Sequence, residues 1–162
     1  MFLLSPQPAF SPNYRSSLRV GSNPKRHFVD PSLSIAAMNL TPSKLKGDLE
    51  TMGLMFEAMC ERDLRVYAQA NNAELFHYRD AENDEIDAII EFSDGRWGAF
   101  EIKLGANQED KAAESLIRIC DKIARRTNKS PPAFKCVILG LSSFAYRRED
   151  DVYSIPITAL RD

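Results

Sequence analysis

Three residues have the types and spacing that metal-dependent chemistry on a phosphate requires: Asp87, Glu101 and Lys103. A carboxylate pair is a natural site for a hard divalent cation, Mg²⁺ or Mn²⁺, since such ions prefer oxygen ligands. Asp87 and Glu101 would supply two ligands, and the carbonyl of Ile102 could add a third. Lys103 could then orient or deprotonate a water molecule, or stabilise charge on a phosphate. The pattern is consistent with metal-assisted hydrolysis of a phosphodiester bond.

Two predicted strands and a tight turn position these residues. The segment 85–91 alternates apolar and charged side chains with the period of two that is typical of a strand. The Ser-Asp-Gly-Arg sequence that follows indicates a turn, because Gly tolerates positive φ and Asp bonds to its own backbone. The next run, 97–103, predicts a strand with Glu101 and Lys103 side by side on the face shared by Trp97 and Ala99. Asp87 lies within reach on the neighbouring strand.

The same residues also have a purely structural interpretation, a partly buried salt-bridge cluster. A buried charge must be paired, and Lys103 could pair with either acid. Glu57 is a further candidate, at the edge of the apolar stripe of a helix predicted from about Asp48 to Ala70. Position alone favours a solvated carboxylate for Glu57, although it could complete the metal shell from the helix.

The predicted elements indicate an α/β domain with a mixed sheet flanked by helices. Two short helices begin where an N-cap residue precedes a proline, at Asp30 and at Thr41. The long helix is followed by three strands, the first at about 74–79. A second long helix over 107–127 and strands at 134–139 and 152–157 complete the pattern.

The N-terminal segment differs from the rest in composition, and we divide the chain into an extended arm, 1–27, and a domain, 28–162. The arm is rich in Pro, Ser, Asn and Arg, which predicts little regular structure. Residues 1–46 carry six Lys and Arg against one acid, whereas the remainder is net negative. A basic arm could contact a phosphate backbone, and the alternative is a solvated terminal segment.

Basic residues also lie at the end of the second long helix: Arg125, Arg126 and Lys129. They could meet phosphate, but cations are favourable at any helix C-terminus. The sequence therefore leaves both interpretations open.

Bulk properties suit one domain of a protein without a membrane span. The chain has 162 residues, no apolar run of the roughly 18 residues that span a bilayer, and a start that is unlike a signal peptide. Three widely spaced cysteines, Cys60, Cys120 and Cys136, predict reduced, mostly buried thiols in a cytoplasmic protein. Two separated histidines do not suggest a histidine-based metal site.

Asp87 and the Glu101-Ile102-Lys103 triplet, with Glu57 on an upstream helix, resemble the PD-(D/E)xK nuclease superfamily, which includes Holliday-junction resolvases. This resemblance implies a restriction-endonuclease-like fold and a DNA substrate. It further implies that Asp87 and Glu101 are metal ligands, Lys103 the catalytic lysine and Glu57 the helical acid. The proline that often precedes the Asp of that superfamily is replaced here by Ile86.

A closer resemblance covers most of the chain after the arm. Lys25 to Leu33 and Gly53 to Glu57 are similar to the opening of an uncharacterised family, the C-terminal nuclease-like domain behind AAA+-type ATPase modules of bacteria and archaea. Tyr78-Arg79-Asp80, Glu85-Ile86-Asp87 and Glu101-Ile102-Lys103 continue the pattern in the same order.

This second resemblance implies an ATPase module as a partner. The chain contains no phosphate-binding GxxxxGK[ST] sequence, so it would correspond to the C-terminal domain alone, a fragment or a truncated gene product. Two functions follow from the sequence: DNA hydrolysis, or a catalytically inactive binding or regulatory module that works with such an ATPase.

Overall fold

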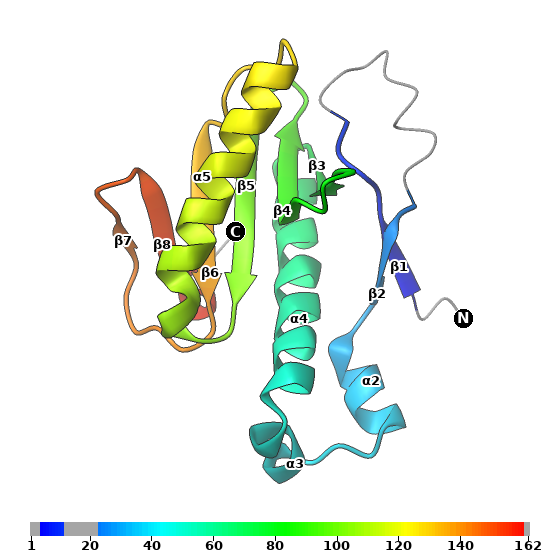
Figure 1. Cartoon of the computed structure of the whole chain (residues 1–162). Helices are drawn as coiled ribbons and strands as arrows, with labels where there is room; N and C mark the ends of the chain where they lie inside the picture. Colours follow the sequence, from blue (N-terminus) through cyan, green and yellow to red (C-terminus); the bar gives the residue numbers. More distant parts are fainter. Residues whose placement is uncertain (1–3, 12–22, 161–162) are drawn as a thin grey trace.

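A mixed sheet of six strands lies between two long helices in the computed structural model, which describes residues 4–11 and 23–160 (Figure 1). The α-helices are α2 (Pro31–Ala37), α3 (Pro42–Gly47), α4 (Leu49–Ala70) and α5 (Glu109–Arg126). The sheet contains β3 (Ala73–Arg79), β4 (Glu85–Phe92), β5 (Trp97–Lys103), β6 (Phe134–Leu139), β7 (Tyr146–Arg147) and β8 (Val152–Pro156). Two short 3₁₀ helices, η1 (Ala106–Gln108) and η2 (Ile157–Ala159), precede α5 and follow β8. The predicted α/β fold, with a mixed sheet flanked by helices, is confirmed.

The strand order is β3-β4-β5-β6-β8-β7. The first three strands form an antiparallel meander, β5, β6 and β8 are parallel, and β7 returns antiparallel to β8. Helix α5 provides the crossover that the parallel pair of β5 and β6 requires. The turn between β4 and β5 closes with Gly95 at φ 85°, and the Asp94 carboxylate accepts a hydrogen bond from the Arg96 amide at 3.0 Å. The predicted hairpin is therefore present.

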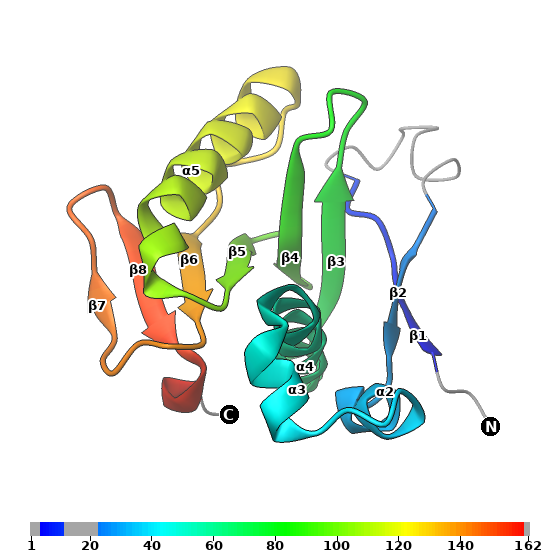
Figure 2. The ribbon, with the colours of Figure 1, turned by 60° about the horizontal axis from the view of Figure 1, so that its bottom comes forward.

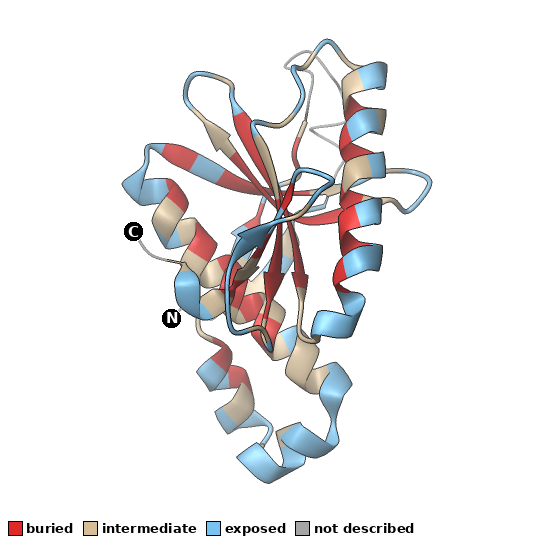
Figure 3. Cartoon of the chain, turned by 90° about the vertical axis from the view of Figure 1, so that its left-hand side faces the viewer, coloured by how far each residue is buried: buried red, intermediate tan, exposed pale blue. Residues whose placement is uncertain are grey.

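The two long helices cover opposite faces of the sheet (Figure 2), and separate hydrophobic clusters lie under them. On one face, Phe56, Cys60 and Leu64 of α4 pack against Phe100 and Ile102 of β5 and their neighbours. On the other face, α5 covers a second cluster, which contains Leu116, Ile119, Cys120, Ile123, Ile89, Trp97 and Ala99. Figure 3 shows that the inner side of α5 is buried and its outer side is exposed. The predicted apolar stripes thus face the sheet.

The predicted distribution of the β5 side chains over the two faces of the sheet is confirmed. The distribution predicted for β4 needs a correction. Two residues of β4, Asp87 and Ala88, oppose the single residue His77 of β3, because the register shifts between Phe76 and Tyr78. This is a β-bulge, which changes the alternation of side chains on one side of it relative to the other. Ile86 consequently joins the α5-side cluster, although Ala88 faces α4. The uniform alternation predicted for this strand is wrong at Ile86.

The caps of the short helices are as predicted. The Asp30 carboxylate accepts a hydrogen bond from the Ser32 amide at 2.8 Å, and Thr41 Oγ1 accepts one from the Lys44 amide at 3.3 Å. The three cysteines are buried and free. Within 4–11 and 23–160 no helix is long and apolar enough to cross a bilayer.

The expectation of little regular structure in the first 27 residues does not hold for the part of them that is described. Strands β1 (Leu4–Gln7) and β2 (Lys25–Phe28) pair antiparallel and form a ribbon beside β3 (Figure 1). Phe10, which is 5% exposed, packs with its ring centroid 5.2 Å from that of Trp97. The apolar and backbone groups of this ribbon therefore bind it to the domain. Arg15 and Arg19 of the predicted basic arm lie outside the described residues.

Candidate functional site

Asp87, Glu101 and Lys103 lie together, as their spacing predicts. The Lys103 Nζ atom is 2.7 Å from Glu101 Oε2 and 3.1 Å from Asp87 Oδ2. Both carboxylate residues are buried, with exposed fractions of 8% for Asp87 and 6% for Glu101. The hairpin thus places two buried carboxylates and one ammonium group at a single point.

The geometry of the hairpin explains how Asp87 reaches the neighbouring strand. Backbone pairing of β4 with β5 ends at the pair Ala88 and Phe100. Beyond that point, the Asp87 carboxylate accepts a hydrogen bond from the Ile102 amide at 2.8 Å. Since a buried amide must have a partner, the side chain of Asp87 replaces a backbone acceptor. The bulge therefore directs Asp87 toward β5.

A polar cavity of about 290 Å³ opens at these residues. Its lining comes from the turn before β4, from the ends of β4 and β5, and from α5: Asn83, Asp84, Glu85, Asp87, Glu101, Lys103, Ser115, Arg118 and Ile119. The four carboxylates outnumber the two cations, so the cavity has an excess of negative charge. Such a lining attracts a cation.

Burial and neighbouring charges shift the pKa values of Glu101 and Lys103. Burial, together with the charge of Asp87, raises the pKa of Glu101 to about 8. Burial acts to lower the pKa of Lys103, but the attraction of Asp87 and Glu101 outweighs it and raises that pKa. Lys103 is therefore charged at neutral pH and stabilises negative charge; it is no proton acceptor in this state.

The residues fit a hard divalent cation by their chemistry. Two close, buried carboxylates offer the oxygen ligands that suit Mg²⁺ or Mn²⁺, and a bound cation would favour the charged form of Glu101, which burial and Asp87 disfavour. No group of three or more His, Cys, Asp or Glu within 4–11 and 23–160 has the arrangement of a metal site. The predicted set of Asp87, Glu101 and the Ile102 carbonyl contains only two such residues and stays a prediction.

Glu57 has a different partner from the other predicted site residues. Its Oε1 atom lies 2.5 Å from Nζ of Lys25, which β2 contributes. Lys25 also lies 3.5 Å from Glu61 and 3.6 Å from Glu85. The structure thus brings Asp87, Glu101 and Lys103 together and places Glu57 in an adjoining cluster around Lys25.

Sequence reasoning missed Lys25 and Arg118. Composition groups Lys25 with the arm, and only the tertiary structure shows that Lys25 pairs with acids of α4. Arg118 precedes Lys122 by one helical turn on the outer side of α5, a spacing that the sequence already offered.

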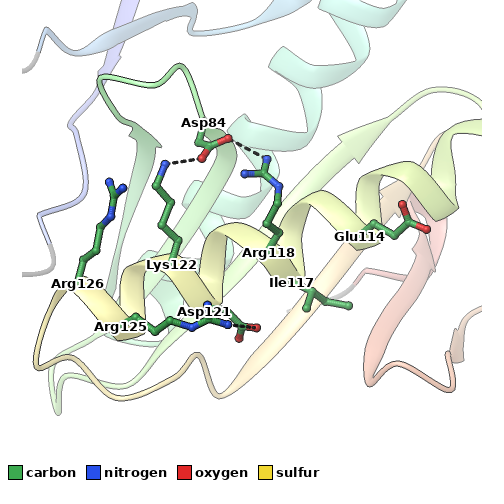
Figure 4. A pocket seen from close by; sticks show the side chains of 8 residues that line it. All are labelled: Asp84, Glu114, Ile117, Arg118, Asp121, Lys122, Arg125 and Arg126. Atoms are coloured by element: carbon green, nitrogen blue, oxygen red, sulfur yellow. Dashed lines mark hydrogen bonds and ion pairs between the residues drawn. The ribbon is translucent and has the colours of Figure 1, made fainter.

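Arg118, Lys122 and Arg126 of α5 bind the turn before β4 and line a groove of about 710 Å³ (Figure 4). Asp84 lies between Arg118, at 2.8 Å, and Lys122, at 2.5 Å. Arg126 pairs with Glu82 at 3.0 Å, and Lys129 pairs with Glu91. The pairs of Asp84 and Glu82 attach the turn to α5, whereas Lys129, beyond the helix, pairs with a residue of β4. A phosphate contact by the helix end stays a prediction.

Comparison with known proteins gives one family and no described activity. A family model, "Domain of unknown function (DUF4143)", matches residues 52–160, more than half of the chain. No curated protein and no solved structure matches. The matched segment contains Glu57, Asp87, Glu101 and Lys103, whereas Lys25 precedes it.

Proposed function

The chain belongs to the family of the domain of unknown function DUF4143, and we propose that it hydrolyses phosphodiester bonds in DNA with a bound Mg²⁺ or Mn²⁺ ion. One observation carries this proposal: two buried carboxylates and a lysine from neighbouring strands meet in a polar cavity with excess negative charge. The resemblance to the PD-(D/E)xK superfamily, noted from the sequence, supports the choice of DNA as the substrate.

Each residue has a distinct role in the proposed reaction. Asp87 and Glu101 would hold the ion, which would supply Lewis acidity and make an attacking water more acidic. The charged Lys103 stabilises the negative charge that develops on the phosphate as the attacking oxygen bonds to phosphorus and the leaving oxygen departs. Burial of the site strengthens this stabilisation, because charges interact more strongly where water is excluded.

The decisive experiment is cleavage of branched, single-stranded and duplex DNA in the presence of Mg²⁺ or Mn²⁺. We expect Lys103→Met to lower the rate by roughly 10²–10³-fold, the range for removal of one electrostatic stabiliser. Lys111→Met, which changes an exposed lysine of α5, is the matched control and should cleave as the wild type does. Wild-type cleavage no faster than that of Lys103→Met would contradict the proposal.

A catalytically inactive module coupled to an AAA+-type ATPase is the second candidate function. The observation that favours it is the ion-pair cluster itself, since Lys103 already contacts both carboxylates. This function predicts that the protein does not bind a divalent cation. Calorimetric binding of Mn²⁺ that Asp87→Asn abolishes would count against it.

A further inference from the structure

Lys25 of the N-terminal ribbon is inserted among three carboxylates of the domain. Its ammonium group lies 2.5 Å from Glu57, 3.5 Å from Glu61 and 3.6 Å from Glu85. The Glu61 side chain is 1% exposed, and its Oε2 atom is 2.6 Å from His27 Nε2, without the alignment of a hydrogen bond. Two side chains of β2 therefore lie against acids of α4 and β4, and the ammonium group of Lys25 contacts acids of both elements.

This cluster adjoins the candidate metal site. Glu85, which contacts Lys25, also lines the cavity that contains Asp87 and Glu101. The buried side chain of Gln7, on β1, donates hydrogen bonds to the carbonyls of Phe76 at 2.8 Å and Asp87 at 3.3 Å. Both strands of the ribbon thus contact residues at the site.

We propose that Lys25 is a further residue of the site, a fixed positive charge that weakens binding of a divalent cation and holds Glu57 away from it. The inference rests on the proposed function, because it concerns the cation that Asp87 and Glu101 would bind. The N-terminal ribbon would then take part in the site, in addition to its packing on the domain.

The direction of the effect follows from electrostatics. Burial acts to lower the pKa of Lys25, but attraction by Glu61 and Glu57, with a contribution from Asp87, outweighs it and raises that pKa, so the group is charged. A charged ammonium group repels an incoming Mn²⁺ ion and neutralises the carboxylates that would attract it. By reciprocity, a bound cation must weaken docking of the ribbon by the same factor.

Calorimetric titration of the full chain with Mn²⁺ tests this inference. We expect the neutral variant Lys25→Met to bind Mn²⁺ about fivefold more tightly than the wild type, or more, within the usual range of coupling between sites. Lys25→Arg keeps the charge and should remain close to the wild type. Lys46→Met, at an exposed lysine of α3, removes one charge far from the cluster and serves as the matched control.

A second variant and two further measurements keep the test decisive if Lys25→Met does not fold. Lys25→Gln is a second neutral variant, and circular dichroism checks the fold of each protein. In the wild type, saturating Mn²⁺ should speed hydrogen exchange at the amides of β2, because the ion and the docked ribbon disfavour each other.

The outcomes separate this inference from the proposed function. Wild-type binding that depends on Asp87, with equal or weaker binding by the neutral Lys25 variants, overturns the inference alone. Absence of Mn²⁺ binding in the wild type and in both neutral variants overturns the inference and the proposed function together. Tighter binding by the neutral variants, with Lys25→Arg and Lys46→Met near the wild type, supports both.

Discussion

At the scale of single residues, Glu101 shows how a site can oppose stability. Its carboxylate is buried beside that of Asp87, and one ammonium group serves both. Burial and the charge of Asp87 raise the pKa of Glu101 to about 8, so the environment disfavours its charged form. A residue chosen only for packing would be apolar, because a buried ionic cluster is often less stable than an apolar one.

Glu101→Gln should therefore separate stability from metal binding. The amide keeps the shape and replaces a group whose charged form the folded protein disfavours, so we expect the metal-free protein to gain roughly 1–3 kcal/mol in free energy of unfolding. Mn²⁺ binding should be lost. Urea denaturation in EDTA measures the stability, and Glu114→Gln, at an exposed position of α5, is the control. A less stable Glu101→Gln protein would show that Glu101 is present as a structural ion-pair partner.

At the scale of elements, close packing of β5 on β6 supports the hairpin that carries the site. Gly98 of β5 pairs with Phe134 of β6. A Cβ atom on residue 98 would lie 2.2 Å from the Phe134 ring, a distance that forces the ring to move. Phe134 also packs edge-on against Phe100, with centroids 5.4 Å apart. The position of β5, and with it Glu101 and Lys103, thus depends on the lack of a side chain at Gly98.

Gly98→Ala should destabilise the protein by roughly 1–3 kcal/mol, the usual cost of overpacking a core. Thermal or urea unfolding measures the loss, and the double variant Gly98→Ala with Phe134→Leu should recover part of it. Gly53→Ala in α4 is the control, because a methyl group there would have no neighbour within 4 Å beyond the backbone of its own helix. We expect that control to be stabilising, by about 0.5–1 kcal/mol, as Ala favours a helix interior. Equal effects of the two Ala substitutions would exclude the packing explanation.

At the scale of the whole molecule, the N-terminal ribbon completes the edge of the domain beside β3. The carbonyl of Pro8 accepts a hydrogen bond from the His77 amide, and the Phe10 amide donates one to the His77 carbonyl. The His77 side chain is 6% exposed. Burial and the charge of Lys25 lower its pKa from the ordinary value of 6.5. Docking of the ribbon thus keeps His77 neutral.

This burial predicts a loss of stability in acid. Below pH 6.5 the unfolded chain takes up a proton on His77 and the folded chain does not, so the free energy of unfolding falls as pH decreases toward the lowered pKa. Above pH 6.5 the contribution of His77 is fully present. His77→Gln should flatten the decline between about pH 7 and pH 5, as measured by urea denaturation across that range. An unchanged slope would mean that groups other than His77 account for the acid sensitivity.

Much of the fold could be predicted from local sequence, because periodicity and caps report which side chains are buried. The stripes of α4 and α5, the caps at Asp30 and Thr41, and the Gly95 turn all act over a few residues. The bulge at Asp87 escaped prediction, since one extra residue in a strand is visible only against its partner. The predicted face of Ile86 is wrong for that reason.

The sequence by itself determined which groups can do chemistry and that Asp87, Glu101 and Lys103 would meet, because a hairpin of fixed length brings its strands into register. The tertiary structure decided what surrounds them. It paired Glu57 with Lys25 across 32 positions of sequence and placed Arg118 of α5 at the rim of the cavity. Such contacts depend on how distant elements pack, and no local pattern of the chain encodes that packing.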